Sequence, residues 1–188
     1  MLWHRTHEVP VRDQSTATDG AAEALADRCL AELGTVPRGS QLAWIYREGT
    51  ELFAYPAALG KVLASAWRRE GSIGQPESWL GAFRVARYTT DTVERLGGEL
   101  TIYRGCPTPT SARRMSWTLD LERARWFAGR QAFFGYTGAG LVYQGTVDSV
   151  DALAYFTGRE EAEVVVDPKA IRDLQRIETV ESILGRLV

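Results

Sequence analysis

The sequence predicts an α+β fold, organised as one domain with helices first and a β-rich part second. Two observations support this prediction. Apolar residues recur three and four positions apart through residues 21–98, which is the period of a helix with one buried face. Residues 99–188 instead contain short segments that alternate or are fully apolar, around a single helical segment. Residues 1–20 are polar and are expected to form an arm.

The helical part is expected to contain four helices, most of them marked by a local signal. Asp19 is placed to cap the first helix, and Gly34 closes it. Pro56 suits the first turn of the third helix, where its missing N–H would have no partner. Gly97-Gly98 ends the fourth helix. We therefore expect helices over residues 20–33, in the region after Gly39, from Pro56 onward and over residues 78–96.

The β-rich part is expected to consist of short strands with one inserted helix. Strands are predicted over residues 99–105, 115–119, 141–147, 161–166 and 171–180. Asp120 caps the helix over residues 121–130, and a loop punctuated by glycines follows over residues 131–140. A turn begins at Asp148, a loop runs through Gly158, and a short helix ends the chain.

Composition and charge limit the classes of function. The chain has 188 residues, which suits one domain, and its formal net charge is -2 with acidic and basic residues interspersed. Such a balance gives no electrostatic argument for non-specific binding to nucleic acid or to a membrane. No apolar run is long enough to span a bilayer, and the first residues lack the apolar core of a signal peptide. We therefore expect a cytoplasmic protein, or one delivered into a target cell.

The cysteines and histidines give no sign of a metal site. Cys29 and Cys106 are far apart and match no metal-binding spacing, so we expect two free thiols. His4 and His7 are the only histidines, and both lie in the predicted arm. No metal cofactor is expected.

Three short segments of the β-rich part carry candidate chemistry, and the first is Tyr103-Arg104-Gly105 at the end of a predicted strand. An arginine at such a place is usually a solvated edge charge or an ion-pair partner. The functional alternative uses its planar, permanently charged guanidinium, which binds phosphate oxygens at two points. Gly105 would let the backbone turn close beside a ligand.

The second segment is Ser116-Trp117-Thr118, on a short strand before a helix. The two hydroxyls are two residues apart, so they lie on the same face of the strand. The simplest interpretation is a strand that contains Ser and Thr without a special role. The functional interpretation is that hydroxyls on the wall of a cleft hold a carboxylate or hydrogen-bond a ribose.

The third segment is EEAE at residues 160–163, followed by three valines. Glu161 and Glu163 share a strand face, whereas Glu160 lies on the opposite one. Glu163 borders the apolar run, where a carboxylate is costly unless it has partners or a function. Paired carboxylates are typical of glycosidic-bond chemistry, in which one stabilises an oxocarbenium-like centre and the other moves a proton.

Together the three segments resemble the R-S-E class of mono-ADP-ribosyltransferases, the cholera-toxin-like and C3-like group. Members of that class have an aromatic residue and an arginine on a first strand, Ser-x-Thr on a second and Glu-x-Glu on a later one. The order and spacing match over residues 99–168. The resemblance implies a single ADP-ribosyltransferase-like domain, in which helices pack beside a split β-sandwich with an NAD cleft. NAD would be the substrate.

The resemblance also implies roles for the motif residues. Arg104 would bind the NAD phosphates and brace the site. Ser116 would hold Glu163 in position, and Thr118 would support the adjoining strand. Glu163 would bind the nicotinamide ribose and stabilise the oxocarbenium ion as nicotinamide leaves. Glu161 would polarise or deprotonate the acceptor, and Glu-x-Glu accompanies modification of arginine in this class.

Further residues are expected around the cleft by the same resemblance. The residues expected to contact NAD are Tyr103, Arg104, Gly105, Ser116, Trp117, Thr118, Phe127 and Phe134. The residues expected to recognise the acceptor, on a turn before the glutamates, are Tyr155, Phe156, Arg159 and Glu160. Trp44, Trp67 and Trp79 fall in helical segments and are interpreted as core residues.

Three hypotheses of function follow. The first is a mono-ADP-ribosyltransferase that modifies a macromolecule, as a toxin, an anti-phage effector or a phage enzyme, with protein arginine favoured as acceptor and RNA or DNA next. The second is an NAD glycohydrolase, with water as acceptor. The third is a non-catalytic binding module, against which the intact Arg, Ser and Glu argue. An antitoxin or immunity protein is a further candidate partner, which the sequence does not identify.

Overall fold

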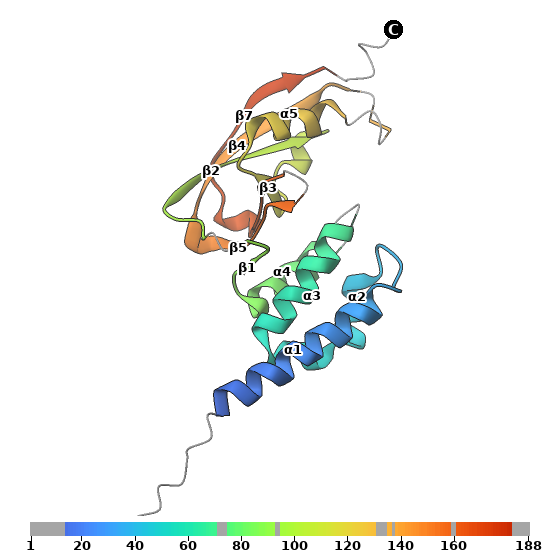
Figure 1. Cartoon of the computed structure of the whole chain (residues 1–188). Helices are drawn as coiled ribbons and strands as arrows, with labels where there is room; N and C mark the ends of the chain where they lie inside the picture. The colour runs from blue at the N-terminus through green and yellow to red at the C-terminus, as the bar shows by residue number, and fades with distance from the viewer. Residues whose placement is uncertain are drawn as a thin grey trace, which may run out of the picture.

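The computed structural model describes residues 14–70, 75–92, 95–130, 135–136, 138–158 and 161–181 (Figure 1). Several predictions lie outside the described residues. These are most of the N-terminal arm, the helix at the C-terminus, and the expected site residues Phe134, Arg159 and Glu160.

The predicted α+β class is confirmed, with a helical part before a mixed sheet. The helices are α1 (Gln14–Leu33), α2 (Gln41–Arg47), α3 (Pro56–Arg69), α4 (Pro76–Ala86) and α5 (Leu121–Gly129). The strands are β1 (Thr89–Thr90), β2 (Glu99–Cys106), β3 (Ser116–Thr118), β4 (Gly140–Asp148), β5 (Ala152–Phe156), β6 (Glu163–Val166) and β7 (Arg172–Val180). Pro56 begins α3 as predicted, and the Asp120 side chain caps α5 by accepting from the backbone N–H groups of Glu122 and Arg123.

The predicted bounds of the first and fourth helices were wrong. Helix α1 begins at Gln14, so Asp19 lies inside the helix and does not cap it. Helix α4 ends at Ala86, ten residues before the expected end. Arg87 has a φ of 61°, which breaks the helix, and the following β-branched pair Thr89–Thr90 joins the sheet as β1.

Strand β5 was not predicted, because a turn and loop were expected after Asp148. The turn is present, but Ala152–Phe156 then pairs with β6 and β1. The strand that contains the three valines, β6, was expected to begin at Glu161, and it begins at Glu163. Ala162, between the two glutamates, has a φ of 41°, which is incompatible with an extended strand.

The strands form one sheet in the order β1-β5-β6-β3-β2-β4-β7. Strands β1 and β5 are parallel, and the other neighbours are antiparallel. A single register pair, Tyr103 with Thr118, joins β2 to β3, whereas β2 and β4 pair along their length. The sheet therefore has two halves, β1-β5-β6-β3 and β2-β4-β7, held together by a short seam.

Two core clusters lie on opposite faces of strand β6. Val165 belongs to the larger cluster, which contains the apolar faces of α1–α4. Val164 and Val166 belong to a second cluster, which includes Ile102 and Val147 from the other half of the sheet. Because side chains alternate along a strand, β6 is buried on both faces, as its run of valines predicted.

Helix α5 covers the β2–β4 half through two glycines. A Cβ at Gly105 would lie 2.0 Å from the Ala124 carbonyl oxygen, and one at Gly140 would lie 2.1 Å from the Ala128 carbonyl oxygen. Gly105 is thus required for close packing of α5 against β2, and its predicted role beside a ligand stays a prediction.

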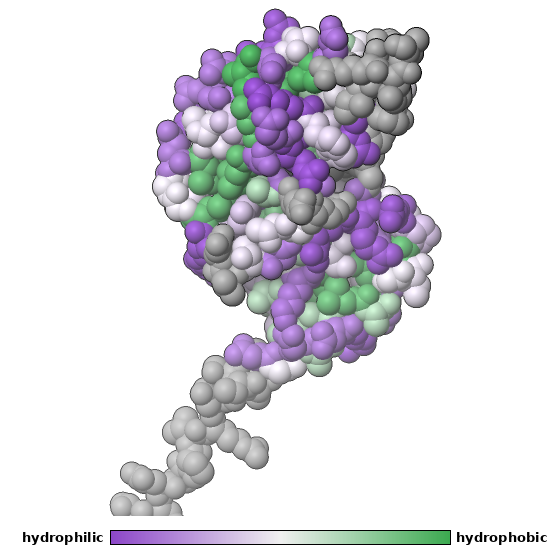
Figure 2. Space-filling view, turned by 45° about the horizontal axis from the view of Figure 1, so that its top comes forward, coloured by the Kyte–Doolittle hydropathy of each residue, from purple (hydrophilic) through white to green (hydrophobic). Residues whose placement is uncertain are grey.

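The helices α1–α4 gather at one end of the molecule, and the sheet with α5 forms the other (Figure 1). On the face seen in Figure 2, hydrophobic residues form small separate groups between hydrophilic ones. Among the described residues no helix has the length and apolar content needed to cross a membrane.

Candidate active site

A pocket of about 770 Å³ lies where helix α3 meets strands β2, β3 and β6. It falls within the volume range of small-molecule sites. The pocket contains charged residues of both signs, namely Glu70, Arg104, Arg114, Arg130, Glu161 and Glu163. All three of the predicted motifs therefore contribute to one cavity.

Arg104, near the end of β2, is anchored by backbone carbonyls. Its Nε donates to the Ser111 oxygen at 3.0 Å, and its Nη1 donates to the Ser116 oxygen. Burial lowers the pKa of Arg104 from its ordinary value to about 10; Cys106 and Glu163 oppose this shift, and Arg114 adds to it. The guanidinium remains charged at neutral pH, so it both braces β3 and presents a cation to the pocket.

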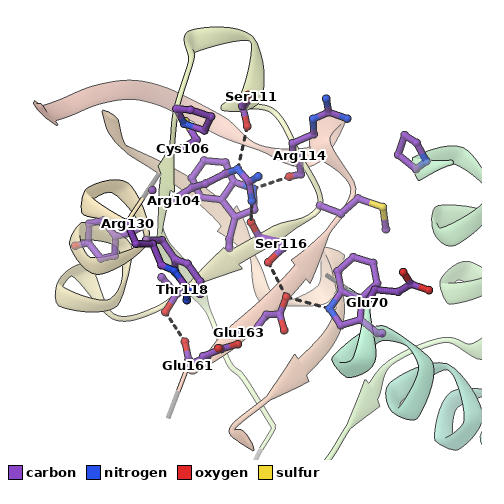
Figure 3. A pocket seen from close by; sticks show the side chains of 18 of the residues that line it. Glu70, Arg104, Cys106, Ser111, Arg114, Ser116, Thr118, Arg130, Glu161 and Glu163 are labelled. Carbon is purple, nitrogen blue, oxygen red and sulfur yellow. Dashed lines mark hydrogen bonds between the residues drawn. The ribbon is translucent and has the colours of Figure 1, made fainter. Parts of the chain in front are cut away.

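Ser116 and Glu163 lie on the face of the sheet that meets the helices. Strands β3 and β6 pair with Ser116 opposite Val165 and Thr118 opposite Glu163, so Ser116 is a diagonal neighbour of Glu163. The Ser116 Oγ donates to Glu163 Oε1 at 2.6 Å, as expected for a serine that holds the carboxylate. Figure 3 shows this bond, with Arg104 and Arg114 on one side of Ser116 and Glu161 and Glu163 on the other.

Glu163 receives a second hydrogen bond, which the sequence did not predict. The indole Nε1 of Trp67, near the end of α3, donates to Glu163 Oε1 at 3.0 Å. Trp67 is 4% exposed and Glu163 is 8% exposed. Trp67 is a core residue as predicted, but its polar edge belongs to the site. Spacing along α3 gives no signal for this, because the partner is 96 positions away.

Glu161 lines the pocket from the segment just before β6. Its carbonyl oxygen accepts from Thr118 Oγ1 at 2.5 Å, and the next carbonyl, of Ala162, accepts from the N–H of Leu119 at 3.1 Å. Thr118 thereby supports the adjoining segment. The expectation that Glu161 and Glu163 share a strand face was wrong, but the left-handed backbone at Ala162 still leaves both residues in the pocket.

The other residues expected to contact NAD divide into two groups. Tyr103 and Phe127 are half-buried and line the pocket. Trp117 also lines it, but only 2% of its surface is exposed, and its Nε1 donates to the Arg114 oxygen at 2.7 Å. Because alternation turns the Trp117 ring toward the second core cluster, the ring is mainly a core group.

The prediction that Tyr155 and Phe156 recognise an acceptor was wrong. Tyr155 and Phe156 lie in strand β5 and are 7% and 1% exposed. Their apolar rings pack into the two core clusters, because the segment is a central strand rather than a surface turn. They present no surface to a macromolecule.

Several pocket residues were not singled out from the sequence as site residues, among them Trp67, Glu70, Arg114 and Arg130. Arg114 follows a turn before β3, and Arg130 is the C-cap of α5, with its guanidinium 4.2 Å from the Trp126 ring centroid. Isolated charges of this kind are common on surfaces, so only the fold identifies them.

The pocket thus combines arginines, which suit phosphate groups, with carboxylates, which suit a developing positive charge. Comparison with models of known protein families, with curated proteins and with solved structures gave no match. A functional assignment therefore depends on the geometry of the pocket.

Proposed function

We propose that the protein is a mono-ADP-ribosyltransferase that cleaves the nicotinamide bond of NAD and transfers ADP-ribose to a macromolecule. The observation that carries this proposal is the chain of contacts in which Arg104 holds the Ser116 carbonyl and the Ser116 hydroxyl holds Glu163. Three residues from separate strands, chosen from the sequence for one chemistry, occupy one pocket with Glu161.

The reaction breaks the bond between ribose C1′ and the nicotinamide nitrogen. Both electrons of that bond go to the ring nitrogen, so nicotinamide leaves neutral and the ribose becomes an oxocarbenium ion. The Glu163 carboxylate, buried and held by the Trp67 and Ser116 donors, supplies negative charge beside this cation. The acceptor nitrogen then bonds to C1′ and releases its proton, which Glu161 takes up.

The arginines fit the other end of NAD. A diphosphate carries negative charge that planar guanidinium groups bind well, and Arg104, Arg114 and Arg130 line the pocket. Arg104 stays charged at neutral pH despite burial. The two halves of the sheet, joined by one register pair around a shared core, are compatible with a split β-sandwich beside an NAD cleft.

The acceptor is proposed to be a macromolecule, with a protein arginine favoured over RNA or DNA. Glu161 supports transfer to a macromolecule rather than to water, since it places a second carboxylate in the pocket with Glu163. Such an enzyme would act as a toxin or as an effector in conflict between a phage and its host.

Transfer is tested by incubating the pure protein with NAD labelled in the adenylate part and a cell lysate. Label in protein and label in nucleic acid are counted separately beside free nicotinamide, with Glu163→Gln as the matched control. Label in protein that the variant does not produce supports the proposal. Nicotinamide release without label on protein or nucleic acid would identify an NAD glycohydrolase. The absence of both label and free nicotinamide would contradict the proposed activity.

A further inference from the structure

Helix α3 reaches the proposed catalytic carboxylate through one buried side chain. Trp67 Nε1 donates to Glu163 Oε1 at 3.0 Å, and both residues are more than nine-tenths buried. The same oxygen accepts from Ser116 Oγ at 2.6 Å. One carboxylate oxygen is therefore held from two sides, by strand β3 and by the helical part of the molecule.

The direction of the Trp67 N–H is fixed by its neighbours. The Trp67 ring meets the Trp79 ring edge-to-face, with centroids 5.1 Å apart and planes at 82°. It meets the Phe83 ring in the same manner, at 5.2 Å and 81°. Rotation of the indole would disrupt both contacts, so the cluster orients the donor toward Glu163.

A second link joins the end of α3 to the segment that leads into β6. Arg68, next to Trp67, pairs with Asp91 at 3.4 Å. The Asp91 carboxylate accepts from the backbone N–H of Thr157 at 2.8 Å and of Gly158 at 3.3 Å. These residues follow β5 and precede the two glutamates, so α3 holds the β5–β6 connection near its beginning and at Glu163.

We propose that Trp67 is a positioning residue for Glu163 in the reaction. This inference rests on the proposed function. The indole fixes the rotamer of the carboxylate and favours its charged form, because a hydrogen bond to a charged acceptor is stronger than one to a neutral acceptor. Trp67 acts on the step in which positive charge develops, and it leaves the binding of NAD by the arginines unchanged.

The activity test compares Trp67→Phe with Trp44→Phe. Both residues are buried tryptophans of the larger core cluster, and Trp67 is the one of the two that donates to Glu163. Trp67→Phe should lower kcat for nicotinamide release about tenfold to a hundredfold, with KM for NAD unchanged. Trp44→Phe should keep kcat near the wild-type value. Equal loss of kcat in both variants, or no loss in Trp67→Phe, would overturn the inference.

A spectroscopic test does not depend on turnover. The indole N–H resonance of Trp67 is assigned by its absence in Trp67→Phe, and is then followed in Glu163→Gln and Glu161→Gln. We expect an upfield shift in Glu163→Gln, because the acceptor loses its charge, and little change in Glu161→Gln. A resonance that does not move in Glu163→Gln would overturn the inference. If the wild-type protein released no nicotinamide, the proposed function would fail, and this resonance alone would decide whether Trp67 holds Glu163.

Discussion

Ser116 and Glu163 are joined by a 2.6 Å hydrogen bond between Oγ and Oε1, although neither is the direct cross-strand partner of the other. The bond is diagonal across β3 and β6. The short strand β3 is itself held by Arg104, which donates to the Ser116 carbonyl. The position of the carboxylate thus depends on the backbone of β3 as well as on the Ser116 hydroxyl.

Removal of that hydroxyl should slow the reaction without preventing NAD binding. Ser116→Ala deletes a hydroxyl donor to a buried carboxylate, a loss of about 1.5–3 kcal/mol. We expect kcat for nicotinamide release to fall about tenfold to a hundredfold with KM little changed. Ser149→Ala, which changes a serine outside the pocket, is the control, and a kcat equal to that of this control would argue against the role of Ser116.

Substitution of Glu161 and substitution of Glu163 should affect different steps of the reaction. Glu161→Gln retains the size of the side chain but removes the base, so transfer to an acceptor should be lost while release of nicotinamide to water continues. Transfer is measured as label on protein, and hydrolysis as nicotinamide formed without acceptor. Hydrolysis lost equally in Glu161→Gln and Glu163→Gln would refute this division of roles.

The sequence predicted which three residues share a pocket better than it predicted the bounds of the elements around them. Arg104, Ser116 and Glu163 could be chosen because their chemistry and their order along the chain are local information. The left-handed backbone at Ala162 and the parallel pairing of β1 with β5 could not, since each depends on strands that meet only in the folded chain.

The functional contact of Trp67 could not be predicted from the sequence either. An apolar position on α3 predicts burial, and burial is found, but nothing near it in sequence marks its N–H as a partner of Glu163. In the same way, the burial of Tyr155 and Phe156 could be recognised only once β5 was placed between β1 and β6.

Gly140 should be sensitive to a single added methyl group. Its Cβ would lie 2.1 Å from the Ala128 carbonyl oxygen, so α5 must move away from β4. We expect Gly140→Ala to lower the free energy of unfolding by about 1–3 kcal/mol. Gly97→Ala is the control, because among the described residues beyond its chain neighbours nothing lies within 4 Å of its Cβ position. Urea unfolding of both variants measures the difference. Equal stabilities would show that α5 does not pack in this manner.

NAD binding should depend on the charge of Arg104. Burial lowers the pKa of this guanidinium to about 10, so it is charged below that pH and loses its charge above it. Affinity for NAD, measured by calorimetry, should be level around neutral pH and should weaken as the pH rises past about 10. In Arg104→Gln the remaining affinity should lack this alkaline decrease. The same decrease in the variant would assign it to another group.

We infer that Glu163 drives cleavage of the nicotinamide bond, and nicotinamide release from NAD by the pure protein and by Glu163→Gln tests this inference. We expect measurable release by the wild-type protein and a loss of at least about a hundredfold in the variant, with NAD binding retained. Equal release by the two proteins, or no release and no NAD binding by either, would contradict it.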